Sequence, residues 1–355
     1  MAEPSTSTDS LSIAVREGVI SQAQADAILA IKARSEGGDE PFTLVNNFGD
    51  LFLCLGLLIV YMSMSRFAGM LGLDPIAVYL MFAALFWVLA EVFVFKARRK
   101  FPAVVSVLLF IWLGVQAYMA IAPNSFSWTA IFAGRGEIGL LGVLTALFVV
   151  TMIRFRLPIL VFGLAVSAVG LIFTYAMRHV EPLAAFSVLA LCGAALIAAG
   201  IYLDSRDRNR TGQQHEWALW LFVVGSPLMV HGVMLYVLKD HLAMFALGAS
   251  SGNPDLLIAQ LGTVVWVISG LALAFTVVGL ILDRRSLVAS SLLYFTAVLT
   301  YAAYQSGAGL TVIVAAVPLA IGLLVIVLGL AWNPLRKLVL RVVPFGRWFR
   351  PPSEV

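Results

Sequence analysis

Residues 139–177 read GLLGVLTALFVVTMIRFRLPILVFGLAVSAVGLIFTYAM. Two apolar runs, 137–153 and 157–176, meet there at the basic turn Arg154-Phe155-Arg156-Leu157-Pro158. Each run is about long enough to cross a bilayer as an α-helix. A turn this short leaves the two helices antiparallel neighbours. The stretch therefore predicts a transmembrane helical hairpin with its basic turn in water.

The same pattern continues over most of the chain, which is 61% hydrophobic and only 12% charged, against about 25% charged residues in soluble domains. We predict an all-α, polytopic transmembrane helix bundle of about ten spans at 48–330. A cytoplasmic tail with a short helical hairpin precedes it at 1–47, and a basic amphipathic cytoplasmic tail follows at 331–355. The predicted spans are 48–65, 75–95, 102–121, 137–153, 157–176, 182–203, 217–238, 257–282, 286–305 and 310–330.

The basic residues alternate between the gaps and so predict the orientation. Of the 23 Lys and Arg, 19 fall in the two tails or in every second gap. Loops that keep Lys and Arg are normally cytoplasmic, so both termini are expected in the cytoplasm and the number of spans should be even. These residues flank helix ends rather than forming one continuous face, so no nucleic-acid partner is expected. The basic residues outside this set are Arg66, Arg135, Arg178 and Lys239.

The amino-terminal segment predicts two short helices, at 11–17 and 22–35. Gly18 should end the first helix, and Ser21 with Gln24 forms a capping-box pattern at the start of the second. About 27 residues are too few for an independent core. We expect this hairpin to dock on the cytoplasmic face of the bundle or on a membrane-protein partner.

The carboxyl-terminal tail predicts a short basic amphipathic helix lying along the anionic inner leaflet of the membrane. Its apolar residues alternate with cations, so the lipid bilayer is the expected partner. A membrane-protein partner that binds this tail is the other expectation. The apolar positions are Leu335, Leu338, Val339 and Val342, and the basic ones are Arg336, Lys337 and Arg341.

Two terminal motifs carry a family resemblance. The stretch LSIAVREGVISQAQA at 11–25 resembles the amino-terminal motif of a broad group of uncharacterised bacterial multi-span inner-membrane proteins, in which a Gly-apolar-Ile-Ser turn precedes a Gln-rich helix. The tail WNPLR at 332–336, running on to Pro344, is similar to the ending of the same group. The resemblance covers about a tenth of the chain. It implies a bacterial inner-membrane protein and brings no activity with it.

Charged residues within spans are the first candidates for function, because they are costly in lipid. Asp50 lies at the inner end of the first span and Glu91 near the inner end of the second. Lys96 or Arg98 could pair with Glu91. An interfacial ion pair is favoured over a proton or ion site for both carboxylates, and Glu91 is the better ion-coupling candidate.

His231 lies deeper, about two turns from the outer end of the seventh span, and follows Ser226-Pro227. A helix broken at this proline would free backbone carbonyls, as in many transporter sites. A histidine that hydrogen-bonds a neighbouring helix in an ordinary bundle fits the same residues equally well. Both interpretations stay open at this point.

Further polar residues gather in the outer half of the predicted spans, where they could line a cavity open to the outside. An interfacial aromatic belt explains the tyrosines equally well, but it does not explain the glutamines. A metal site from His179, Glu181, His231 and His241 is disfavoured, because no two of them have ligand spacing on one helix. The outer polar residues are Gln116, Tyr118, Tyr175, Tyr236, Gln260, Tyr301, Tyr304 and Gln305.

The match of 248–252 to G-x-S-x-G is attributed to a flexible loop, because that motif needs a strand-to-helix turn. We expect no catalytic residues, no metal and no cofactor. The preferred hypothesis is a permease that moves a small solute or lipid-like molecule through an outer-facing cavity. The alternative is a non-catalytic subunit or scaffold of a larger membrane complex, which the scarcity of deep charges favours. The candidate binding residues are His231, Glu91, Gln116, Gln260 and Asp50.

Overall fold

The computed structural model describes residues 8–35, 48–70, 72–122, 138–206, 213–237, 254–305, 307 and 309–342. Within these ranges every regular element is a helix. The described helices fall into two units. One holds the first two helices, the other holds all the rest, and each is described by itself.

The amino-terminal unit consists of α1 (Thr8–Arg16) and α2 (Gln22–Ser35). The backbone N–H of Ser21 donates to Gln24 Oε1 at 2.8 Å, and the backbone N–H of Gln24 donates to Ser21 Oγ at 3.2 Å. This reciprocal pair is the predicted capping box. Gly18, with φ at +71°, follows the end of α1, as predicted. The first helix begins at Thr8, three residues before the predicted start.

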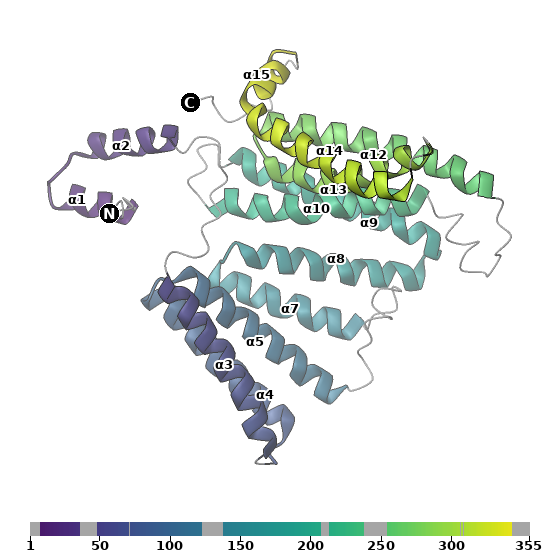
Figure 1. Ribbon diagram of the computed structural model, residues 1–355. Coiled ribbons are helices and arrows are strands. Elements are labelled where there is room, and N and C mark those ends of the chain that lie inside the picture. Colours follow the sequence, from purple (N-terminus) through teal and green to yellow (C-terminus); the bar gives the residue numbers. More distant parts are fainter. Residues whose placement is uncertain are drawn as a thin grey trace. The chain divides into compact units, whose positions relative to one another are not determined.

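In the larger unit, ten long helices of the described residues lie at the ten predicted segments (Figure 1). They are α3 (Phe48–Met70), α4 (Pro75–Glu91), α5 (Lys100–Ile121), α7 (Ile138–Phe155), α8 (Ile159–His179), α9 (Pro182–Arg206), α10 (Gln213–Val237), α12 (Pro254–Leu282), α13 (Arg285–Gln305) and α14 (Leu310–Leu330). A π-helical turn, η1 (Val92–Lys96), extends α4, and α15 (Trp332–Val342) follows α14. Eight of these helices are long and apolar enough to span a membrane over their described residues; α3 has a shorter apolar stretch, Phe48–Met64, and α13 is not among the eight.

Consecutive helices form antiparallel hairpins: α4 with α5, α7 with α8, α9 with α10, and α12 with α13 (Figure 1). Three of the connecting turns hold a non-glycine residue with positive φ, namely Arg98 (52°), Arg156 (52°) and Asp283 (55°). After Asp283, the N–H of Arg284 donates to the carbonyl of Gly279 at 2.8 Å, which is the long bond of a Schellman motif. We call the helix ends that carry these turns, together with the end of α9 and the start of α10, the basic end.

Two apolar cores hold the hairpins together. Val107 and Leu160, both fully buried, belong to a core shared by α4, α5, α7 and α8. Phe222 and Leu287 belong to a core shared by α9, α10, α12 and α13. Side chains of α8 and α10 pack in a further cluster, which joins the two sets of hairpins.

In the α9–α10 hairpin two helix backbones come close together, and glycine permits this approach. A Cβ on Gly193 would lie 2.4 Å from the backbone N of Met229, and one on Gly232 would lie 2.4 Å from the backbone N of Ala190. Small residues allow this approach of two backbones. Gly270, by contrast, has no neighbour within 4 Å of such a Cβ.

The outer surface of the bundle is apolar. Only 11% of the apolar stretch of α14 is buried inside the bundle. Its side chains Leu319, Leu323 and Leu330 are 73%, 60% and 82% exposed. A soluble protein rarely exposes apolar patches of this extent, whereas hydrocarbon lipid is their natural solvent. The larger unit is thus an apolar helical bundle suited to a membrane.

Candidate functional site: a buried charge cluster at the basic end

Asp50 is tied to the neighbouring hairpin at the basic end. It lies in the first turn of α3 and is 1% exposed. Arg99 Nη1 donates to Asp50 Oδ1 at 2.9 Å. Arg99 follows the left-handed Arg98, so the turn before α5 positions the guanidinium toward α3. The carboxylate of Asp50 is therefore held in an ion pair.

Glu91, the last residue of α4, pairs with Arg154 at the end of α7. Arg154 Nη2 donates to Glu91 Oε2 at 2.6 Å, and the guanidinium carbon lies 4.5 Å from the ring centroid of Phe95. The predicted pairing of Glu91 with Lys96 or Arg98, from the same helix end, was therefore wrong. Sequence spacing reveals only local neighbours, whereas packing of Trp87 against Phe155 at 4.9 Å brings the ends of α4 and α7 together.

The most buried charge of the described residues is Arg284, which is fully buried in the turn between α12 and α13. Its Nη2 donates to Asp204 Oδ1, and its Nε donates to Asp204 Oδ2 at 3.4 Å. Nη2 also lies 2.7 Å from His215 Nδ1. Asp204 belongs to the last turn of α9 and His215 to the first turn of α10, and both side chains are buried. The three residues are called the charge cluster below.

The protonation state of His215 follows from this geometry. A guanidinium can only donate hydrogen bonds, so His215 Nδ1 must accept with its lone pair. The ring is then neutral and carries its proton on Nε2. A protonated His215 would place a second cation against Arg284 and remove this hydrogen bond. With the Arg284–His215 hydrogen bond in place, the charge cluster combines one carboxylate, one guanidinium and one neutral imidazole.

The charge cluster is linked to α15 through the next residues of the same turn. Trp332 Nε1 donates to Asp283 Oδ1 at 2.8 Å, and the guanidinium carbon of Arg285 lies 5.7 Å from the Trp332 ring centroid. Trp332 is 3% exposed and packs with Leu280 and Val288. The first residue of α15 is thereby fixed beside Arg284.

Sequence reasoning had a partial signal for this site. The segment LDSR at 203–206 echoes LDRR at 282–285, because each ends a span in the same direction. The structure shows that the two segments meet, with the Asp of the first bound to the first Arg of the second. Nothing in the sequence singled out His215, which sits among ordinary polar residues before a span.

The predicted site residues do not form one site. His231 lies 16 residues after His215 on α10, which corresponds to about 24 Å along a helix, so it is far from the basic end. Its side chain is exposed on the surface of α10, and Gln116 is half-buried on α5. The side chain of Gln260 lies outside the described residues. Asp50 and Glu91 lie at the basic end, where the sequence predicts them.

The proline of α10 does not break the helix. α10 runs without interruption from Gln213 to Val237, through Pro227. The hydroxyl of Ser226 donates to the carbonyl of Phe222 at 2.6 Å, so this side chain folds back on its own helix. Of the two interpretations of His231, the broken helix is therefore contradicted.

The outer histidines are only partly described. His179 Nδ1 lies 2.9 Å from the carbonyl of Tyr175, and the two rings stack with centroids 4.1 Å apart. His241 falls outside the described residues. In the part of the chain that the structure describes, no three His, Cys, Asp or Glu side chains gather as a metal site.

Comparisons with protein families, with characterised proteins and with solved structures found no match to this chain.

Proposed function

We propose that this chain is a ten-span permease of a bacterial inner membrane, with both termini in the cytoplasm, and that the charge cluster closes its cytoplasmic end. The distribution of Lys and Arg supports this orientation, because the basic end then faces the cytoplasm. The cargo class is a small solute or a lipid-like molecule that enters from the outer half of the bundle.

The observation that carries the proposal is the burial of Arg284 with Asp204 and His215, where the ends of α9 and α10 meet the α12–α13 turn. Replacing a buried ion pair by apolar residues is often neutral or stabilising, so such a pair is weak evidence for a purely structural role. Ionisable residues within membrane bundles commonly mark pathways for ions or substrates. A charge pair that can separate into water is well suited to a gate.

The gate would work by exchanging protein contacts for water. In the closed state Arg284 holds α9 and α10 against the α12–α13 turn. When the ends separate, Asp204 and Arg284 become hydrated, and hydration offsets part of the lost attraction. Alternating access in transporters consists largely of such rocking of one helix bundle against another. The Asp50–Arg99 and Glu91–Arg154 pairs would hold the other hairpins at the same face.

The outer half supplies the candidate cargo contacts. His231, Gln116 and Gln260 remain the proposed binding residues there. Glu91 remains the proposed coupling acid, and it would have to release Arg154 to take up a proton. This arrangement separates a binding region near one face from a gate near the other.

The test is flux through proteoliposomes that contain the purified full chain. The probes are a panel of isotope-labelled amino acids, sugars, nucleosides and organic acids, together with a fluorescent phosphatidylcholine for lipid movement. We expect uptake or lipid movement of at least one probe above protein-free vesicles, with losses in His231→Ala and Glu91→Gln. Flux unchanged in both variants would remove the site assignment, and no flux of any probe would argue against a permease.

A second candidate function, a non-catalytic subunit of a larger membrane complex, is favoured by α14. Its span is 11% buried, whereas the other seven candidate spans are 28% to 44% buried over their described residues. A partner helix could cover this face. Purification in mild detergent separates the two candidates, because a stoichiometric partner favours the subunit and a lone protein favours the permease.

A further inference from the structure

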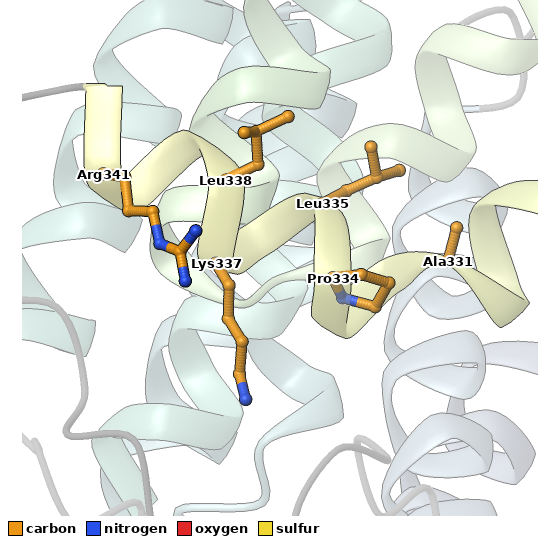
Figure 2. Close-up of a pocket in the computed structure, with 6 residues that line it drawn as sticks. All are labelled: Ala331, Pro334, Leu335, Lys337, Leu338 and Arg341. Atoms are coloured by element: carbon orange, nitrogen blue, oxygen red, sulfur yellow. The ribbon is translucent and has the colours of Figure 1, made fainter.

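α15 presents two faces with different surroundings. On the inner face Trp332 is 3% exposed and Arg336 is 9% exposed. On the outer face Leu338 is 57% exposed and Val342 is 73% exposed, next to exposed cations. As the sequence predicts, Leu335 and Leu338 lie on one side of α15, and Lys337 and Arg341 lie on the other (Figure 2). Trp332 docks the helix on α12 and α13, and Leu338 and Val342 stay exposed.

A shallow, open groove of about 440 Å³ runs along the outer face of α15, and its described lining comes from this helix and from Ala331 just before it. Figure 2 shows these side chains. Lys337 and Arg341 extend toward one side of α15, and Leu335 and Leu338 point to the other. The groove thus has a cationic edge and an apolar edge. The lining residues are Ala331, Pro334, Leu335, Lys337, Leu338 and Arg341.

We infer that this groove binds an anionic phospholipid of the leaflet at the basic end, with its phosphate on Lys337 and Arg341 and its first acyl carbons on Leu338. An arginine fork and a lysine ammonium are both established phosphate-binding groups. The sequence of α15, WNPLRKLVLRV, contains no carboxylate that would oppose an anion.

The position of the groove matches the level of lipid headgroups. Only Ala331 separates the end of α14 at Leu330 from the start of α15 at Trp332. A helix that begins where a span ends lies in the interfacial region, where cations meet phosphates and leucines meet acyl chains. Leu338 and Val342, exposed beside the cations, can then enter the hydrocarbon boundary. The inference rests on the cytoplasmic placement of α15 in the proposed function, but it does not depend on transport.

The test is lipid binding to the purified full chain in detergent, followed by native mass spectrometry. The protein is titrated with dioleoyl-phosphatidylglycerol or dioleoyl-phosphatidylcholine. Each cation near an anionic surface contributes about fivefold in affinity, so Lys337→Gln/Arg341→Gln should weaken phosphatidylglycerol binding about thirtyfold. Binding of phosphatidylcholine should not change. The charge-retaining Lys337→Arg/Arg341→Lys variant should keep the affinity for phosphatidylglycerol.

The matched control is Lys96→Gln/Lys100→Gln. It also removes two exposed cations at the basic end, but from the end of η1 and the start of α5. It should leave phosphatidylglycerol affinity unchanged. Equal losses in both double variants, or no loss in either, would overturn the inference. Displacement of the lipid by excess inorganic phosphate would also overturn it, since the groove would then be a site for free phosphate. Because flux is measured separately, failure of this lipid site and failure of the permease proposal are distinguishable.

Discussion

Breaking the charge cluster one residue at a time should cost far more stability than removing it whole. Arg284→Met leaves the carboxylate of Asp204, whose side chain is 4% exposed, without its guanidinium. Asp204→Leu leaves the fully buried guanidinium without its carboxylate. Removing one partner of a buried pair typically costs about 3–5 kcal/mol, so each variant should lower the free energy of unfolding by that amount.

The double variant Asp204→Leu/Arg284→Met should recover most of this loss. Apolar replacement of a buried ion pair is often neutral or better, and the hydrogen bond lost from His215 costs about 1–3 kcal/mol. The double variant should unfold with a free energy within about 2 kcal/mol of wild type, whereas the two single losses sum to about 6 kcal/mol or more. The coupling energy between the two residues, which is the difference, is then about 4 kcal/mol or more.

The assay is equilibrium unfolding of the purified full chain in mixed micelles by titration with dodecyl sulfate, followed by circular dichroism. Glu91→Leu and Arg154→Met provide the matched control, since those side chains are 27% and 48% exposed. Exposed pairs contribute about 0–1 kcal/mol, so these two variants should unfold close to wild type. A loss in Arg284→Met no larger than that in Arg154→Met, or additive losses in the double variant, would refute the buried cluster.

Three further predictions concern local structure, and each is measured by unfolding of the full chain or by hydrogen exchange. Gly193→Ala should destabilise the α9–α10 hairpin by about 1–3 kcal/mol because its Cβ meets backbone, whereas Gly322→Ala, with open space around it, should be neutral or stabilising; equal effects would contradict the glycine contact. Arg156→Gly should stabilise the α7–α8 turn by about 0.5–1 kcal/mol, because glycine adopts the positive φ of this position without strain. Arg156→Ala should give no such gain. A gain in the alanine variant would mean that loss of the arginine charge, and not relief of backbone strain, stabilises the turn. Ser21→Ala should speed amide exchange at the start of α2 by about fivefold, because a lost cap costs about 1 kcal/mol; unchanged exchange would mean that the capping box is not formed in solution.

Much of the fold could be predicted because its determinants are local. An apolar run of span length, such as 310–330, specifies a helix whatever surrounds it, and α14 has those bounds. The capping box at Ser21 was equally readable, since both of its hydrogen bonds join residues three apart.

The candidate site could be predicted only in part, because its partners are distant in sequence. Arg284 lies 80 residues from Asp204 and 69 from His215, and Arg154 lies 63 from Glu91. Hydropathy and the alternation of charge predict where each span ends along the sequence. They do not predict which span ends lie next to one another in the folded bundle. The amphipathic pattern of α15 was readable from the sequence, but the docking of Trp332 on Leu280 and Val288 was not, because these residues are distant along the chain.

The most direct test of the account asks whether the charge cluster closes the cytoplasmic end. In a chain with Cys54→Ser and Cys192→Ala, Ala218→Cys places a thiol at a fully buried position of α10, three residues from His215 and on the same helix face. Inverted membrane vesicles are treated with a membrane-impermeant maleimide, and Lys337→Cys serves as the exposed reference. We expect rapid labelling of Lys337→Cys and slow labelling of Ala218→Cys. Labelling of Ala218→Cys should become at least about tenfold faster when Arg284→Gln shifts the gate by about 1.4 kcal/mol toward the open state. A labelling rate of Ala218→Cys that does not change with Arg284→Gln, or labelling of Lys337→Cys only from the outer side, would contradict these expectations.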